Sequence, residues 1–89
     1  MRTPGNIKRA PRIDVRKTAV VVNSDGVAVA VTLLDISGSG FRIHVTENLR
    51  IGEFVTLRVD GTELPAQIRW VLGDEAGGAF LVPVDAQAL

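Results

Sequence analysis

The chain has 89 residues, of which 46% are hydrophobic, and its formal net charge is zero. This length fits a single domain and leaves no room for a second core of useful size. The absence of cysteine excludes a disulfide framework, a thiolate metal site and a cysteine nucleophile. The zero net charge argues against nucleic-acid binding driven by the release of counterions.

Charge is unevenly distributed along the chain. The first 17 residues hold six Lys and Arg residues against Asp14 alone, so the remainder is mildly acidic. The N-terminus lacks the apolar segment of a secretory signal, and the most apolar stretch, residues 27–34, is far shorter than the ~20 residues of a membrane-spanning helix. We therefore expect a soluble, cytoplasmic protein with no membrane insertion.

Apolar and polar residues alternate between Gly and Asp punctuation, which is typical of strands, and helical periodicity is hard to find. The pattern predicts six strands, at residues 15–22, 27–34, 41–46, 55–59, 64–72 and 79–84. Six short antiparallel strands most economically close into a barrel, because closure removes exposed edges. The fold class expected is all-β, a six-stranded antiparallel barrel over residues 13–89, preceded by a flexible basic arm over residues 1–12.

The predicted connections differ in how clearly the sequence marks them. Residues 23–26 end in Asp-Gly, and Asp60-Gly61-Thr62 is another tight hairpin signal. Residues 73–78 are predicted to be a loop, and Pro83 suggests an edge position or a bulge in the last strand. Residues 47–53 fit either a plain loop or one turn of helix, from which Leu49 and Ile51 could still reach the core.

The arm is the first candidate for a functional role. Lys8, Arg9 and Arg12 precede the first strand, and Pro11 fixes its own φ and biases Ala10 towards extended geometry. A stiff cationic arm of this kind can close over an anionic ligand. The alternative is that the run is a solvated tail, which is the commoner role of basic termini.

The second candidate is the polar segment of residues 35–40, between two apolar strands. Asp35 and Ser37 supply acceptors and a hydroxyl, while Gly38 and Gly40 permit close approach of the backbone. The alternative is an ordinary turn in which the Asp and Ser side chains bond local amides.

The remaining polar and aromatic residues give weaker evidence of a functional role. His44 alternates with apolar residues on a strand, so a satisfied or exposed strand histidine is favoured over a catalytic base for Ser37 or Ser39. The acidic residues are scattered and form no metal-ligand cluster. Trp70 and the three phenylalanines, Phe41, Phe54 and Phe80, are interpreted as core residues, too few for base stacking on single-stranded nucleic acid.

In combination, the arm, a strand pair and then Asp35-x-Ser37-x-x-Gly40 resemble the PilZ domain family, whose second motif is Asp/Asn-x-Ser-x-x-Gly. Residues 64–71 are similar to the family's later strand with its common Trp, and residues 77–82 to its closing strand. When the family's first motif, Arg-x-x-x-Arg, is aligned by its position before the first strand, its two arginines fall on Lys8 and Arg12. Lysine therefore replaces the first arginine, and the neighbouring Arg9 could compensate for it. A literal match at Arg12 and Arg16 would place Arg16 inside a strand.

The resemblance implies a non-catalytic receptor for cyclic di-GMP, with no cofactor. Lys8, Arg9 and Arg12 would contact phosphates and guanine edges, Asp35 would accept from guanine N1 and N2, Ser37 would bond near a phosphate, and Gly40 would allow close approach. The alternative is a degenerate PilZ domain that binds no nucleotide and acts as an adaptor, and Lys8 favours it. Either form would act on a downstream protein partner in motility, pili or exopolysaccharide control; the oligomeric state is left open.

Overall fold

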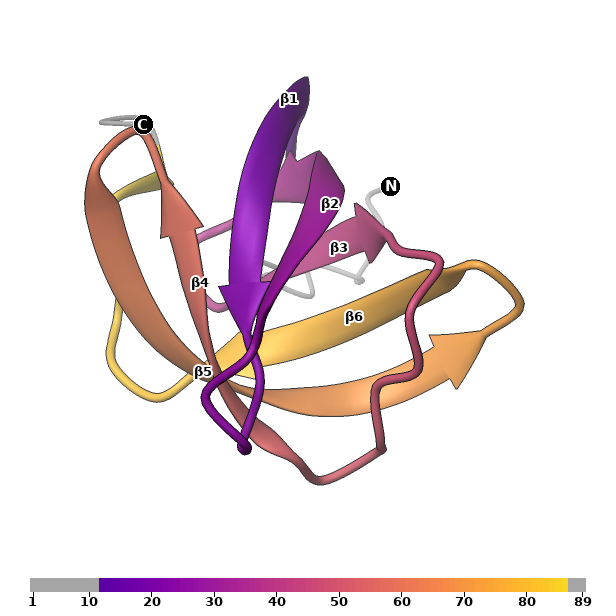
Figure 1. Ribbon diagram of the computed structural model, residues 1–89. Helices are drawn as coiled ribbons and strands as arrows, with labels where there is room; N and C mark the ends of the chain where they lie inside the picture. Colours follow the sequence, from indigo (N-terminus) through magenta and orange to yellow (C-terminus); the bar gives the residue numbers. More distant parts are fainter. Residues whose placement is uncertain (1–11, 87–89) are drawn as a thin grey trace, which may run out of the picture.

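The computed structural model describes residues 12–86 as a closed barrel of six antiparallel strands (Figure 1). The order of strands around the barrel is β1-β2-β3-β6-β5-β4. The strands are β1 (Ile13–Val22), β2 (Ala28–Ile36), β3 (Gly40–His44), β4 (Phe54–Val59), β5 (Thr62–Leu72) and β6 (Glu75–Phe80). The all-β barrel predicted from alternation is therefore confirmed.

The core consists of the inward-facing residues of all six strands. Alternation on β4 is the clearest case, because Val55, Leu57 and Val59 are buried while the residues between them are not. Phe41 lies deep in the barrel with its ring centroid 5.3 Å from that of Phe80. Burial of apolar side chains from every strand supplies the main driving force for closure.

Turn chemistry explains two of the connections. Asn23 Oδ1 accepts hydrogen bonds from the amides of Asp25 and Val27 at 2.9 and 3.0 Å, which orders the turn between β1 and β2. Asp60 and Gly61 both have positive φ, 50° and 79°, as the tight hairpin between β4 and β5 requires. Both turns were predicted from their Asp-Gly pairs.

The sixth strand was predicted too late in the chain. The predicted loop at residues 73–78 and strand at 79–84 are replaced by a short turn and by β6 at Glu75–Phe80, so Pro83 lies beyond the strand. Gly77 and Gly78 were predicted to be loop residues, yet they lie in β6, where neighbouring aromatic rings leave no room for a side chain. A Cβ on Gly78 would lie 2.5 Å from the Phe41 ring, and one on Gly77 would lie 2.1 Å from Trp70 Nε1.

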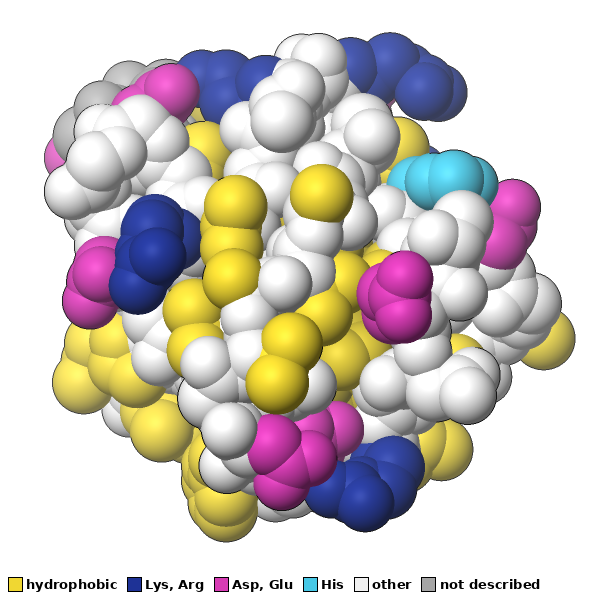
Figure 2. Space-filling view, in the orientation of Figure 1, with side chains coloured by type: hydrophobic (Ala, Val, Ile, Leu, Met, Phe, Trp, Pro, Cys, Tyr) yellow, Lys and Arg dark blue, Asp and Glu magenta, His cyan; other side chains and the backbone are white. Residues whose placement is uncertain are grey.

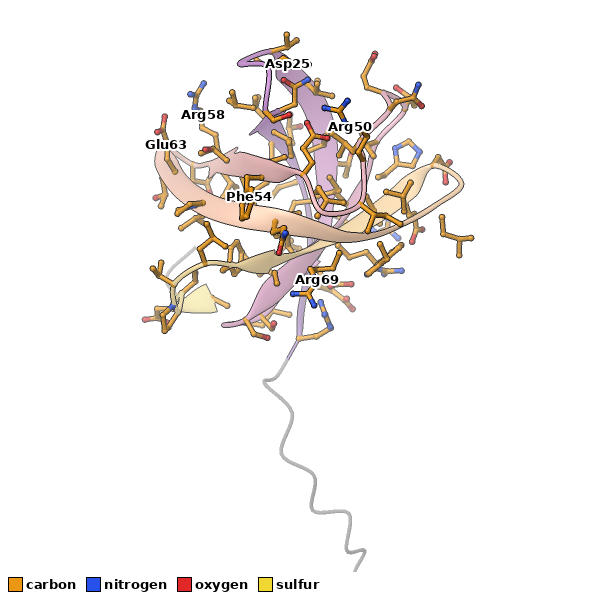
Figure 3. All side chains as sticks on the ribbon, turned by 90° about the horizontal axis from the view of Figure 1, so that it is seen from below. Asp25, Arg50, Phe54, Arg58, Glu63 and Arg69 are labelled. Atoms are coloured by element: carbon orange, nitrogen blue, oxygen red, sulfur yellow. The ribbon has the colours of Figure 1, made fainter. Side chains whose placement is uncertain are left out.

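Two aromatic residues predicted to be core lie outside it. Phe54 is 58% exposed because its neighbour Val55 takes the inward position (Figure 3). Trp70 is 38% exposed because a bulge between Ile68 and Trp70 breaks the inward alternation of β5. One extra residue in a strand moves every later side chain to the other face.

The segment between β3 and β4 forms turns and bends with no α-helix. Leu49 reaches the core, as expected, but Ile51 is exposed. Together with Val45, which directly follows β3, Leu49 is the contribution of this segment to the core.

Candidate functional site

The barrel holds one buried carboxylate between two arginines. Asp35, near the end of β2, has a side chain only 7% exposed. Its Oδ1 lies 2.5 Å from Arg12 Nη1, and its Oδ2 lies 2.8 Å from Arg42 Nε. A charge this far from water is tolerated only when it is paired and hydrogen-bonded. The two guanidinium groups supply that compensation.

Arg12 reaches Asp35 because of where β1 begins. Ile13 pairs with Ile36 across the sheet, so the residue just before Ile13 lies beside the end of β2. The Arg12 side chain stays 55% exposed while its Nη1 contacts the carboxylate. Two candidates that are 23 residues apart in the sequence are thus brought into direct contact.

Arg42 was not among the residues singled out from the sequence. It pairs with Asp35 in the β2–β3 ladder, and its Nη1 also donates to Glu75 Oε1 at 3.2 Å. The hydrogen bond and the charge of Asp35 raise the pKa of Arg42, which keeps this side chain cationic. A signal was present, since Asp35 and Arg42 lie symmetrically about the turn and antiparallel pairing places such residues opposite each other.

The turn between β2 and β3 uses Ser37 and Gly40 for its own structure. The Ser37 hydroxyl is buried and accepts from the amides of Gly40 and Ser39 at 3.2 and 3.3 Å. The Ser37 amide donates to the Gly40 carbonyl at 2.8 Å. A Cβ at Gly40 would lie 2.4 Å from the carbonyl oxygen of Gly78, so glycine is required for β3 to approach β6. A contact of either residue with a ligand stays a prediction.

Lys8 and Arg9 lie outside the described residues. Lys and Arg side chains within the described part gather along the top edge of Figure 2, where β1 begins in Figure 1. Arg12, the last residue of the predicted arm, directly precedes β1.

The register of the strands places Asp35 and the aromatic residue Trp70 in the same row across the sheet. Asp35 pairs with Arg42, Arg42 with Gly77, and Gly77 with Trp70, so one row crosses β2, β3, β6 and β5. Gly77 has no side chain, and the Trp70 indole occupies the space that a Cβ would take. We call Asp35, Arg42, Gly77 and Trp70 the outer row. It presents a carboxylate, a guanidinium and an indole on one face, and all are chemical groups that bind nucleotides.

The remaining polar residues do not form a catalytic arrangement within residues 12–86. His44 Nε2 lies 3.0 Å from Asp74 Oδ2, whereas the hydroxyls of Ser37 and Ser39 contact each other and nearby backbone. Over the same span, no group of three His, Asp or Glu side chains is placed to hold a metal ion. No helix in this part of the chain is long and apolar enough to cross a membrane.

Comparison with known proteins gives a consistent result. The family model of the PilZ domain matches residues 6–89. Among solved structures, the chain is similar to the PilZ domain of CeSA from a cellulose synthesizing bacterium, with 25% sequence identity and a TM-score of 0.68. That similarity covers 88% of this chain and 86% of the other. No curated protein matches this sequence significantly.

PilZ domains are generally non-catalytic binding domains, and their general ligand is cyclic di-GMP. Of the motif residues, Asp35 lies near the end of β2, Ser37 lies in the turn that follows, and Gly40 is the first residue of β3. Motif, barrel topology and family match all agree, and this chain belongs to the PilZ domain family.

Proposed function

We propose that this domain is a non-catalytic receptor that binds cyclic di-GMP on the outer row, between the N-terminal arm and the turn at residues 35–40. The observation that carries the proposal is the buried Asp35 carboxylate held by Arg12 and Arg42. Each arginine is half-exposed, so each can present donors to a ligand while it remains close to Asp35.

The ligand's chemistry matches these groups. Cyclic di-GMP has two phosphates, and its guanines present O6 and N7 acceptors that suit a planar guanidinium. In the proposal Arg12 contacts a phosphate or a guanine edge, and Trp70 provides a flat surface for a base. Lys8 and Arg9 would close over the ligand from the arm.

Both oxygens of Asp35 already accept hydrogen bonds, so a ligand that bonds Asp35 must first displace one of the two arginines. A guanine that donates from N1 and N2 to Asp35 would compete with Arg12, whose side chain is the more exposed of the two arginines. Release of Arg12 from Asp35 would free its guanidinium for a phosphate. The ion pair therefore acts as a placeholder that the ligand exchanges, and ordering of the arm would be the signal passed to a partner.

Lysine at position 8 weakens the expected affinity. It retains the charge for a phosphate contact but lacks the planar fork for a guanine edge, a contact worth about 1–3 kcal/mol. This observation favours the second candidate function, a degenerate PilZ domain that acts as an adaptor without nucleotide. The downstream partner in either case would be a protein that controls motility, pili or exopolysaccharide.

Isothermal titration with cyclic di-GMP tests the proposal. We expect micromolar or tighter binding by the wild type, and a loss of affinity in Arg12→Ala of about tenfold or more. The fluorescence of Trp70, the chain's one tryptophan, gives a second readout at the outer row. Arg58→Ala is the matched control, because Arg58 is an ion-paired arginine on β4. A wild type that shows no binding at micromolar concentrations would favour the adaptor.

A further inference from the structure

A hollow on the outer face lies next to the Asp35 site, and its lining residues are not among those predicted from the sequence to bind the ligand. Its cavity volume is about 360 Å³. We call it the bulge pocket, and it is lined by Arg16, Thr32, Leu34, Arg42, His44 and Glu75. Because Arg42 both lines this pocket and bonds Asp35, the two sites share a wall.

The pocket forms where two strand irregularities coincide. The register of β1 with β2 shifts between Asp14 and Lys17, and that of β2 with β3 shifts between Leu33 and Asp35. Arg16 lies in the first shift with φ of +48°, a conformation that side-chain-bearing residues rarely adopt. Bulges and strained residues of this kind occur preferentially at binding sites, where they re-aim side chains.

Two lining residues have unused bonding capacity. Within residues 12–86, the Arg16 guanidinium has no ion pair or hydrogen-bond partner. Glu75 uses Oε1 for Arg42, and over the same residues Oε2 accepts no hydrogen bond. Asp35, in contrast, has both oxygens engaged by arginines. Counting partners within residues 12–86, the pocket therefore presents one unpaired guanidinium and one carboxylate oxygen that accepts no hydrogen bond.

These two groups are complementary to opposite edges of a guanine base. A guanidinium fork matches the acceptors O6 and N7, and a carboxylate matches the donors N1–H and N2–H. The floor of the pocket includes Leu34, which is buried and apolar enough to contact the face of a base. Adenine fits poorly, because it presents an amino donor where guanine has O6.

We propose that the bulge pocket holds one guanine of the bound nucleotide, with Arg16 donating to O6 and N7 and Glu75 accepting from N1 and N2. This inference rests on the proposed function and adds a base-specific subsite to it. It assigns one guanine to Glu75 and Arg16, while the other guanine would take part in the exchange with Arg12 at Asp35.

Isothermal titration of Arg16→Ala and Glu75→Gln with cyclic di-GMP is the first test. The dissociation constant should rise about tenfold to a hundredfold in each variant. Arg58→Ala and Glu63→Gln are matched controls, because this exposed pair lies on β4 and β5 (Figure 3), and both should bind as the wild type does. Circular dichroism checks that every variant is folded.

A ligand analogue separates recognition from structural support. Cyclic di-IMP lacks the N2 amino group, so the wild type should bind it more weakly than cyclic di-GMP. In Glu75→Gln that difference should shrink, whereas in Arg16→Ala it should persist, because Arg16 contacts the other edge. Equal weakening of both ligands in Glu75→Gln would show a structural role and overturn the proposal.

NMR on the wild-type complex provides evidence that needs no variant. A nuclear Overhauser effect between guanine H8 and the methyl groups of Leu34 is expected, and its absence in a saturated complex would overturn the inference. If the wild type binds and both variants bind equally well, the subsite is refuted while the receptor function stands. If the wild type binds no cyclic di-GMP, the receptor function itself is refuted, and the inference with it.

Discussion

Two nearly buried carboxylates are compensated in different ways in two regions of this barrel. Glu53, just before β4, is 5% exposed in its side chain and accepts hydrogen bonds from the amides of Ser24 and Arg50 and from the Ser24 hydroxyl. Asp35, at the end of β2, is compensated by the side chains of Arg12 and Arg42. One carboxylate is held mainly by backbone, the other by long side chains.

This difference indicates that Glu53 contributes to the stability of the fold, whereas Asp35 can exchange its partners for a ligand. Backbone amides are fixed by the turns that contain them, so the bonds to Glu53 tie the β1–β2 turn to the segment before β4. Arginine side chains that are 55% and 41% exposed can rotate towards water or a ligand at small cost. We infer that Glu53 stabilises the fold and that Asp35 is held in a form that a ligand can take over.

The largest expected effects come from exchanging the two carboxylates for alanine. Asp35→Ala should lower the affinity for cyclic di-GMP by about tenfold to a hundredfold. The stability of this variant should change little, because Arg12 and Arg42 can be hydrated. Titration calorimetry and urea unfolding measure the two quantities.

Glu53→Ala should show the reverse pattern. Loss of the acceptor for three donors should lower the free energy of unfolding by about 1–2 kcal/mol, while nucleotide affinity stays unchanged. The comparison between the carboxylates breaks down if Asp35→Ala proves the more destabilising of the two in urea.

The pH dependence of stability sharpens the comparison at a smaller scale. Burial alone would raise the pKa of Glu53, but hydrogen bonds from Ser24 and Arg50 outweigh it and hold the pKa below its ordinary value of 4.5. The stabilising contribution is therefore complete above pH 4.5 and is lost as the pH falls through the lower folded value. In thermal melts the advantage of the wild type over Glu53→Gln should shrink in that acidic range, and a constant advantage would contradict the assignment.

The smallest effect is expected at an ion pair that is exposed on both sides. Arg58 Nε lies 2.9 Å from Glu63 Oε2 with both side chains open to water (Figure 3). Arg58→Ala should cost less than about 0.5 kcal/mol of stability, because solvent screens such pairs. If Arg58→Ala lowers the free energy of unfolding in urea as much as Glu53→Ala does, burial does not determine the size of these effects.

Local sequence signals predicted most of the barrel and part of the site. Alternation placed five strands close to their observed positions, and the Asp-Gly pairs marked two turns. The motif around Asp35, together with the basic arm, placed Arg12 and Asp35 on one face, and the structure brings them into contact. Their ligand roles, and those of Lys8, Arg9, Ser37 and Gly40, stay predictions.

The misses share one physical origin, since each depends on register between strands. Trp70 faces outwards because β5 has a bulge, and β6 starts early because Gly77 and Gly78 are needed beneath neighbouring rings. Arg42 and Glu75 became site candidates only when β3 paired with both β2 and β6. The alternation of apolar and polar residues within one strand carries no information about how that strand pairs with others.

By itself, the sequence determined the all-β class, the tight turns and the family motif, because these depend on residues close together in the chain. Tertiary structure alone decided which side chains share the outer row, where the bulge pocket opens, and that both oxygens of Asp35 but one oxygen of Glu75 are engaged within residues 12–86. Those features depend on pairing between strands that are distant in sequence, and a shift of one residue reverses the face that each side chain occupies.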